Sequence, residues 1–367
     1  MKYRIIHILA GKANPDTMNG VNRVVDALAT EQHRAGYDVA VFGVASNTQK
    51  RHIPEYGYFL FTASRMPFIL PAGLLDSLLE YSDTDTVFHF HSVFITWYLP
   101  LMTALEHHGR NRFFYTPHGG LTDESMKGLS KRLYYRIVER EVIRHTEAVQ
   151  LMGGRNEDNA YAGTARRKVF IPNGITRAEL SVPPEKDPVI GFLGRLECHQ
   201  KGLDVLIPAF AGYKRQGGRC RLAIAGDGQD AAVLRRLVKE RGVSGDVTFT
   251  GPLLGDGKER FIRSISAHIL PSRFEGFPMA CLETAAVGCV QLVTPGTNLC
   301  GAVTDFNAGI VAPSVSVNAI SLQLEAFDSL LSDRAAFLTK RFNAWNMAME
   351  YSWDNISNRI IHELYEL

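Results

Sequence analysis

The sequence lacks the marks of a disulfide-rich, secreted or membrane-spanning protein. Its five cysteines show no C-x-x-C spacing, so neither a zinc ligand set nor a disulfide framework is implied. No apolar run approaches the ~20 residues that a membrane-spanning helix needs. The opening residues 1–11 have too short an apolar core for a signal peptide and no clear cleavage site. We therefore expect a protein of a reducing compartment, the cytoplasm.

An excess of charge of one sign is also missing. The sequence has 40 lysine and arginine residues and 38 aspartate and glutamate residues, which leaves a formal net charge of +2. This balance gives no general attraction to nucleic acid, and we expect no nucleic-acid partner. A content of 46% hydrophobic and 21% charged residues is typical of a soluble globular enzyme, and 367 residues suffice for two domains.

A dinucleotide-binding fingerprint is absent, although the chain begins like an α/β protein. The apolar run Arg4 to Ala10 predicts a strand, residues 21–35 carry apolar side chains at helical spacing, and Val39 to Val44 predicts a second strand. No G-x-G-x-x-G follows the first strand, and the loop there ends in Asn19-Gly20. The order strand–helix–strand favours an α/β fold.

The same alternation restarts after a proline-rich linker. Three prolines lie within residues 182–188, and Val189 to Leu193 then predicts a strand that is followed by a helix. We therefore expect two doubly wound parallel sheets. In such sheets ligands bind at the carboxyl ends of the strands.

One stretch, residues 267–288, combines two carboxylates with backbone groups that can bind an anion. His268 to Leu270 predicts a buried strand, and a loop carries Glu275. A helix predicted from Met279 to about Val287 carries Glu283, with Pro278 at the helix start, where proline is favoured. Unpaired N–H groups of the loop and the helix start can bind a phosphate, and the carboxylates can accept hydrogen bonds from hydroxyls on either side of it. This arrangement suits a sugar–diphosphate–ribose ligand. The alternative is a capped helix with two unrelated glutamates.

A second loop carries basic residues after a predicted strand. Gly194-Arg195-Leu196 follows the strand that ends at Leu193, and Lys201-Gly202 precedes the next predicted helix. Two phosphates that lose water on binding need compensating charge, because an uncompensated buried charge is costly. Arg195 offers a bidentate fork and Lys201 a point charge. The alternative is a pair of exposed basic residues.

Together these motifs resemble those of retaining glycosyltransferases with the GT-B fold, most closely glycosyltransferase family 4. Glu275 and Glu283 have the family's E-x7-E spacing, and Gly276-Phe277-Pro278 follows the first glutamate. The loop that carries Arg195 and Lys201 resembles the family's Gly-Arg-Leu and Lys-Gly elements, and Pro172-Asn173-Gly174 resembles its Pro-Asn-Gly element. The resemblance spans essentially the whole chain.

The resemblance implies two Rossmann-like domains that face each other across a cleft. The expected boundaries are 1–182 for an acceptor-binding domain and 183–348 for a nucleotide-sugar-binding domain. Residues 349–367 resemble the family's C-terminal helix, which crosses back to pack on the first domain.

The resemblance also implies a role for each site residue. Glu283 is expected to bind ribose hydroxyls, Glu275 the hydroxyls of the sugar, and Arg195 with Lys201 the diphosphate. His118, in the loop after the predicted strand Phe113 to Thr116, is expected beside the sugar. The expected catalytic residues are His118, Arg195, Lys201 and Glu275. The expected donor-binding residues are Asn19, Gly20, Asn173, Gly194, Arg195, Lys201, Glu275, Gly276, Phe277, Pro278, Met279 and Glu283. Asn19 departs from the family, which has glycine there.

The implied reaction is hexosyl transfer from a nucleotide-diphosphate sugar to a hydroxyl, with retained anomeric configuration and no enzyme nucleophile. We recognise no Asp-x-Asp metal motif in the sequence, so we expect catalysis without a metal or another cofactor. A UDP-sugar is favoured over GDP-mannose as donor. The expected acceptor is a lipid-linked glycan in the synthesis of lipopolysaccharide or another bacterial surface polysaccharide. Two alternatives are a non-hydrolysing sugar-nucleotide epimerase, which shares the fold, and a non-catalytic nucleotide-sugar-binding protein.

Two stretches of the first half bear on a lipid-linked acceptor. Residues 125–145 predict a basic amphipathic helix that either contacts an anionic membrane surface, at the inner face of the cytoplasmic membrane, or is a solvated face. The apolar residues 58–71 form either core or a wall for the acceptor's lipid tail.

His89 and His91 close a predicted strand that begins at Thr86, and they lie on the same side of it. A metal site would need further ligands close by, and none is evident in the sequence. Histidines at a strand end that face the ligand cleft are the favoured interpretation.

Overall fold

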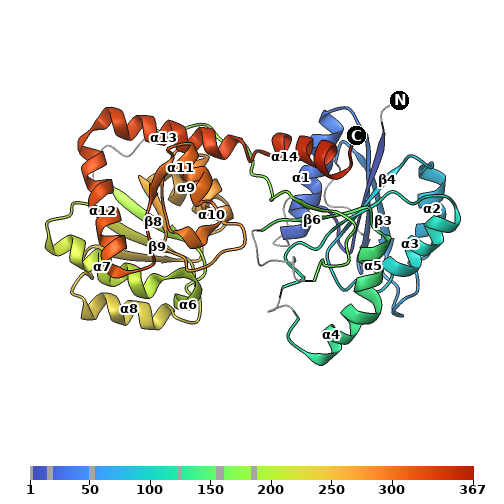
Figure 1. Cartoon of the computed structure of the whole chain (residues 1–367), viewed down its shortest axis with the longest axis horizontal. Coiled ribbons are helices and arrows are strands. Elements are labelled where there is room, and N and C mark those ends of the chain that lie inside the picture. The colour runs from blue at the N-terminus through green and yellow to red at the C-terminus, as the bar shows by residue number, and fades with distance from the viewer. Residues whose placement is uncertain (1–2, 15–19, 49–53, 123–125, 154–160, 183–187) are drawn as a thin grey trace. The chain divides into compact units, whose positions relative to one another are not determined.

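The protein is described by a computed structural model that covers residues 3–14, 20–48, 54–122, 126–153, 161–182 and 188–367. The predicted donor-binding residue Asn19 lies outside these ranges. The chain divides into two compact units (Figure 1), the first made of Met1–Gly174 with Trp353–Leu367 and the second of Ile175–Ser352. The sequence analysis places the corresponding boundaries at 182 and 349.

The first unit is built on a seven-stranded sheet with the order β3-β2-β1-β4-β5-β6-β7. All neighbouring strands are parallel. The strands are β1 (Arg4–Leu9), β2 (Asp38–Ala45), β3 (Gly57–Thr62), β4 (Val87–His91), β5 (Phe113–Thr116), β6 (Ala148–Leu151) and β7 (Lys168–Phe170). The order reverses between β1 and β4, which makes their carboxyl ends the expected ligand edge of this sheet.

Helices cover both faces of this sheet. Figure 1 shows α2, α3 and α5 on one side, while α1 and α14 lie on the other side and contact each other. The helices are α1 (Gly20–Arg34), α2 (Leu74–Tyr81), α3 (Tyr98–His107), α4 (Leu129–Tyr134), the π-helical turn η1 (Tyr135–Glu139), α5 (Arg140–His145), α14 (Trp353–Arg359) and the π-helical turn η3 (Ile360–Leu364). The end of the chain is thus part of the first unit, and Tyr365 is fully buried there.

The second unit has a six-stranded sheet with the order β10-β9-β8-β11-β12-β13, again parallel throughout. The strands are β8 (Val189–Leu193), β9 (Arg221–Ala225), β10 (Val247–Gly251), β11 (Ala267–Leu270), β12 (Val290–Val293) and β13 (Gly309–Val311). This is the doubly wound order in which the winding reverses between the first and fourth strands, here β8 and β11. The two charged loops of the sequence analysis follow these two strands.

The helices of the second unit also form two layers. Helix α7 packs against α12 and α8, while α10 contacts α13 and α9. The helices are α6 (Cys198–Lys201), α7 (Leu203–Arg215), α8 (Ala231–Glu240), α9 (Gly255–Ser264), α10 (Met279–Ala285), the 3-10 turn η2 (Pro295–Thr297), α11 (Cys300–Asp305), α12 (Val317–Ser332) and α13 (Arg334–Met349).

Burial on both faces explains the composition of the strands. The central strand β5 is fully buried along Phe113–Thr116, and all four residues of β11 are buried as well. A strand covered by helices on both faces carries a continuous apolar run rather than an alternating one. The predicted fold class, two doubly wound parallel α/β domains, is confirmed.

The basic helix of the first unit differs from the prediction. The helix begins at Leu129 rather than at residue 125, and a π-helical turn interrupts it at Tyr135–Glu139. The side chains of Leu129, Leu133 and Ile137 are exposed instead of lining the core. None of the helices among the described residues has the length and hydropathy needed to span a bilayer.

Candidate functional site

The loops at the carboxyl edge of the second sheet are packed against each other closely enough to require glycine. Gly202 follows α6 with φ 68°, and a Cβ added to it would lie 2.1 Å from the carbonyl oxygen of Pro271. A Cβ on Gly226 would lie 1.8 Å from the carbonyl oxygen of Gly194. These contacts join the loops after β8, β9 and β11, so residues far apart in the sequence form one surface.

Lys201 and Glu275 form a largely buried ion pair between two of these loops. The Lys201 Nζ lies 2.6 Å from Glu275 Oε1, and the two side chains are 13% and 7% exposed. Ser272 also donates to Glu275 Oε1, and Asn298 donates to the carbonyl oxygens of Glu275 and Gly276. The predicted catalytic residues Lys201 and Glu275 are therefore in direct contact and held in place.

The backbone beside this pair offers hydrogen-bond donors. The N–H groups of Gly276 and Phe277 have no acceptor among the described residues. Helix α10 begins at Met279, the predicted first residue, with Pro278 immediately before it, and it ends at Ala285 rather than near Val287. With only seven residues, α10 has a small dipole. Positive charge at this edge therefore comes from basic side chains rather than from the helix start.

Arg195 is the most exposed of the predicted charged side chains. Its side chain is 70% exposed, donates to Gln200 Oε1 at 3.0 Å, and lies 3.8 Å from a Glu197 oxygen. Gly194, its neighbour, donates its N–H to Ala225. Since none of these contacts is buried, the guanidinium can turn toward a ligand at little cost.

Glu283 has a basic partner that the sequence analysis did not identify. Lys258 Nζ, on α9, lies 2.6 Å from Glu283 Oε2, with side chains 30% and 27% exposed. Lys258 follows β10, so its element also starts at the carboxyl edge of the sheet. Its place just after a strand, at the same edge of the sheet as the other charged loops, is the sequence feature that could have identified Lys258.

The remaining predicted donor-binding residues belong to the first unit. Gly20 opens α1, and a Cβ added there would meet nothing within 4 Å, so the protein itself does not require glycine at this position. Asn173 is half-buried beside Gly174, whose missing side chain makes room for Trp353. These residues belong to the first unit, whereas Lys201 and Glu275 belong to the second.

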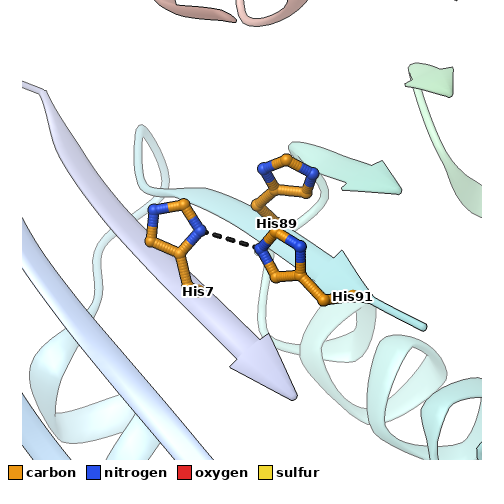
Figure 2. A group of neighbouring side chains, drawn as sticks. All are labelled: His7, His89 and His91. Carbon is orange, nitrogen blue, oxygen red and sulfur yellow. Dashed lines mark hydrogen bonds between the residues drawn. The ribbon is translucent and has the colours of Figure 1, made fainter. Parts of the chain in front are cut away.

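The first unit contains a cluster of buried histidines (Figure 2). His7 on β1 lies beside His89 and His91 on β4, and the residues pair in register as His7 with His89 and Leu9 with His91. One ring nitrogen from each of these three histidines lies within 4.8 Å of the other two. His91 Nδ1 also lies 3.0 Å from His118 Nε2. Sequence reasoning found no third imidazole for His89 and His91; the missing neighbour is His7, which only strand pairing brings close.

Burial keeps these imidazoles neutral. It lowers the pKa of His7 to about 4, partly offset by the hydrogen bond to Gln32. Burial and neighbouring histidines hold the pKa of His89 and His91 well below the usual value, and burial lowers the pKa of His118. In the second unit, burial lowers the pKa of His268 to about 4, partly offset by the side chain of Gln291, which pairs with His268 across β11 and β12.

One Asp-x-Asp triplet does occur in the sequence, outside the charged loops. Asp83-Thr84-Asp85 precedes β4, at the amino end of the strand and therefore at the edge opposite His91. The Thr86 hydroxyl donates to Asp83 Oδ1, which lowers the pKa of Asp83, and the Asp85 N–H donates to the same oxygen. The triplet is a turn that caps a strand start.

An exposed apolar surface lies over the basic helix of the first unit. Leu129, Leu133 and Ile137 are 89%, 59% and 60% exposed. A cavity of about 550 Å³ opens beside them, lined by Met126, Leu129, Arg132, Leu133, Tyr135, Arg136 and Tyr161. The exposed residues Met66, Phe68 and Ile69 continue this apolar surface, because the Phe68 ring stacks on Tyr134 at 6.4 Å. The stretch 58–71 is thus partly surface rather than core.

Two family models match the chain in tandem. The model for "Glycosyltransferase Family 4" matches residues 18–178, and the model for "Glycosyl transferases group 1" matches residues 177–343. Between them they cover most of both units. The chain belongs to the group 1 glycosyltransferases of family 4.

The regions that align with curated relatives cover about half of each relative. An alpha-D-kanosaminyltransferase from Streptomyces kanamyceticus is 26% identical over 216 residues, which are 53% of this chain and 54% of the relative. A lipopolysaccharide 1,6-galactosyltransferase from Salmonella typhimurium is 32% identical over 172 residues, 38% of this chain and 47% of the relative. The chain therefore spans about half the length of the curated relatives it matches.

Solved structures share the fold over the full chain. The Anabaena protein HepE in complex with UDP is 16% identical with a TM-score of 0.69, and the match covers 100% of both chains. The catalytic domain of starch synthase IV from Arabidopsis thaliana bound to ADP and acarbose is 15% identical with a TM-score of 0.71, covering 100% of this chain and 99% of that one. At these identities the likeness shows the fold, which is of the GT-B type.

Replacing His268 with leucine should reduce the acid sensitivity of the protein. The pKa of His268 is about 4 in the folded chain and 6.5 when unfolded, so the unfolded state binds the proton first and stability falls as the pH drops below 6.5. Near pH 5 the native histidine should cost roughly 2 kcal/mol, and His268→Leu should recover this cost less the contribution of the Gln291 contact. Urea unfolding at about pH 7 and about pH 5 measures this. Equal pH dependence in both proteins would contradict the assignment.

Removing one partner of the Lys201–Glu275 pair should destabilise the protein. Lys201→Met leaves Glu275 largely buried without its counter-charge and should lower the free energy of unfolding by about 2–4 kcal/mol. Adding Glu275→Gln should cost less than the sum of the single changes. The more exposed Lys258–Glu283 pair is the matched control, and Lys258→Met should cost about 0–1 kcal/mol. Equal losses at the two sites in urea unfolding would mean that burial does not set the cost.

Proposed function

We propose that this chain is a retaining hexosyltransferase that moves a sugar from a nucleotide-diphosphate donor to a hydroxyl of a glycan acceptor. The observation that carries the proposal is the Lys201–Glu275 pair beside two unused N–H groups, at the crossover point of β8 and β11. Membership of the group 1 glycosyltransferases supports it.

Lys201 can serve Glu275 and a diphosphate at the same time. An ammonium group has three N–H donors, and Glu275 occupies one of them at 2.6 Å. The other donors, the Arg195 guanidinium and the N–H groups of Gly276 and Phe277 can bind phosphate oxygens. These groups stabilise the negative charge that develops as the diphosphate leaves, which is the main catalytic effect expected here.

The two glutamates bind hydroxyls in this proposal. Glu275 Oε1 is held by Lys201 and Ser272, so its position is fixed for the hydroxyls of the sugar. Glu283 accepts from the ribose, with Lys258 holding its carboxylate in place. No carboxylate attacks the sugar; the leaving phosphate takes the acceptor's proton on the same face, which retains the anomeric configuration. Neither a metal nor another cofactor is required in this scheme.

A UDP-sugar is the proposed donor, with GDP-mannose as the second candidate. HepE is a structural neighbour with bound UDP, whereas a relative from Mycobacterium tuberculosis, 27% identical over 202 residues, is a GDP-mannose-dependent mannosyltransferase. The proposed acceptor is a lipid-linked glycan of a bacterial surface polysaccharide, in line with the lipopolysaccharide galactosyltransferase among the relatives.

Two other functions use the same donor-binding groups. A non-hydrolysing epimerase would convert the sugar nucleotide without any acceptor, and a binding protein would neither transfer nor hydrolyse it. Because all three functions need Lys201, Glu275 and Glu283 for the donor, product analysis with and without acceptor separates them.

Arg195→Ala should reduce turnover by ~10²-fold or more while leaving the fold intact. The side chain is 70% exposed, so its removal should not change the free energy of unfolding measurably.

The donor is first identified by thermal unfolding with UDP-sugars, GDP-mannose and NAD, since a ligand at ~100 times its dissociation constant stabilises by about 2.7 kcal/mol. Turnover is then measured with that donor and lipid-linked glycans, and the anomer of the product is read by NMR.

Arg236→Ala is the matched control, because this arginine is also 70% exposed but lies on α8 away from the charged loops. Equal activity of Arg195→Ala and Arg236→Ala would contradict the role of Arg195. Stabilisation by NAD alone, or by none of the ligands, would overturn the proposed function.

We further propose that the exposed apolar surface over α4 and η1 contacts an anionic membrane. Lys131, Arg132 and Arg136 are exposed beside Leu129 and Leu133. Basic side chains near apolar ones favour an interface of anionic lipid, to which each lysine or arginine adds about 1 kcal/mol. Such contact would bring the protein to the lipid-linked acceptor.

Changing Leu129, Leu133 and Ile137 together to serine should weaken binding to anionic vesicles at least ~10-fold, because each buried apolar side chain contributes roughly 1 kcal/mol or more. Co-sedimentation with phosphatidylglycerol vesicles measures the affinity. The control variant, Leu322→Ser with Leu338→Ser, removes exposed leucines from α12 and α13 of the second unit. Failure of the native protein to bind, or equal loss in the control, would refute the membrane contact.

A further inference from the structure

A single line of hydrogen bonds joins His118 to the interior of the first unit. His118 Nε2 lies 3.0 Å from His91 Nδ1, His91 Nε2 lies 2.9 Å from His7 Nδ1, and His7 Nε2 lies 2.7 Å from Gln32 Oε1. His7, His91 and Gln32 have no exposed surface. Three imidazoles are therefore connected in series between a loop at the sheet edge and helix α1.

Each neutral ring in the series has one N–H and one lone pair. Adjacent rings can bond only when one donates and the other accepts, so the choice at one end determines every ring. In the orientation that the structure gives, Gln32 turns Oε1 toward His7 and leaves its amide nitrogen buried without a hydrogen-bond acceptor among the described residues. Because Oε1 only accepts, this orientation makes His7 donate from Nε2 and accept at Nδ1. His91 then donates from Nε2 to His7, and His118 donates from Nε2 to His91. The second nitrogen of His118, Nδ1, is left as an acceptor.

We infer that His91, His7 and Gln32 are positioning residues that hold His118 in its Nε2–H tautomer, so that Nδ1 accepts a hydrogen bond from a hydroxyl of the donor sugar. The sugar part of this inference rests on the proposed function, whereas the tautomer is a property of the free protein. His118 Nδ1 has no partner among the described residues, which leaves it for a ligand.

The backbone at His118 has an unfavourable conformation that needs compensating contacts. Its φ of 54° lies in the left-handed region, which is unfavourable for a residue with a side chain. Gly119 follows with φ 73°, and a Cβ on Gly120 would lie 2.4 Å from Val93. The hydrogen bond to His91 is the side-chain contact that stabilises this turn.

The same cluster does not have the geometry of a metal site. Imidazole ligands must aim lone pairs at one point about 2.0–2.1 Å away. His89 uses both nitrogens on the hydroxyls of Tyr365 and Thr116, at 2.7 and 2.6 Å. The rings of His89 and His91 lie 4.1 Å apart at an interplanar angle of 32°, so their planes are closer to stacked than convergent (Figure 2).

Nitrogen NMR of protein labelled with ¹⁵N-histidine tests the tautomer directly, and His118→Gln assigns the His118 signals. The native protein should show a pyrrole-like Nε2 and a pyridine-like Nδ1 at His118. His91→Asn keeps a side-chain oxygen near the position of Nδ1 and should retain this pattern. His91→Leu removes the acceptor and should give a mixture of tautomers. His89→Leu is the matched control, because His89 is equally buried on the same face of β4 but has no bond to His118.

Activity provides the second readout. In His91→Leu, kcat/KM with the sugar nucleotide should fall about tenfold, the equivalent of one hydrogen bond. The affinity for the free nucleoside diphosphate should stay unchanged, because that ligand lacks the transferred sugar that His118 would bind. His91→Asn should recover most of the activity, and His89→Leu should keep it. A general loss of structure would instead lower both kcat/KM and the affinity for the nucleoside diphosphate.

The outcomes separate the two proposals. A native His118 with Nδ1–H or with both nitrogens protonated, a bound zinc ion in the purified protein, or equal effects of His89→Leu and His91→Leu would overturn the positioning chain. If His91→Leu changes the tautomer but not kcat/KM, the role in sugar binding is wrong. If the predicted tautomer is found but no sugar nucleotide binds, the proposed function fails while the hydrogen-bonded chain stands. Should His91→Leu not fold, the native protein and His91→Asn still decide the tautomer.

Discussion

The site in the second unit depends on two opposite charges that have been taken out of water together. Lys201 and Glu275 are separated by 2.6 Å and are 13% and 7% exposed. Either charge alone would be costly in that position, so the loops after β8 and β11 must stay in contact. The left-handed Gly202, against the carbonyl of Pro271, is what allows that contact. Arg195, by comparison, is exposed and can follow a ligand as it binds and leaves.

In the first unit, the buried histidines are neutral and are satisfied by hydrogen bonds rather than by ion pairs. His7, His89 and His91 are fully buried, and burial depresses their pKa values, so neutral rings joined by hydrogen bonds replace ion pairs. In a series of neutral imidazoles each ring donates to one neighbour and accepts from the other, so the hydrogen bonds all run in one direction. An ion pair imposes no such order. The first unit therefore supplies a group with a defined donor and acceptor side, whereas the second supplies compensated charge at the carboxyl edge of its sheet.

The sequence predicted those features that neighbouring residues determine, and it missed those that depend on contacts between distant residues. The strands Phe113–Thr116 and Val189–Leu193 were predicted to the residue, because buried parallel strands are continuous apolar runs between turn residues. The partners His7 of His91 and Lys258 of Glu283 were missed, since strand order and helix orientation bring them together. The helix expected over 125–145 begins only at Leu129, and its leucines face outward because periodicity does not say which side is covered.

The return of the chain to the first unit has a consequence for how the protein is made. Trp353–Leu367 folds with Met1–Gly174, and its last turn supplies the Tyr365 hydroxyl to His89 and backbone carbonyls to Arg112 and Arg167. On the ribosome, these groups emerge only after the whole of the second unit. Until then, His89, Arg112 and Arg167 lack these partners, so the unit synthesised first is the one completed last.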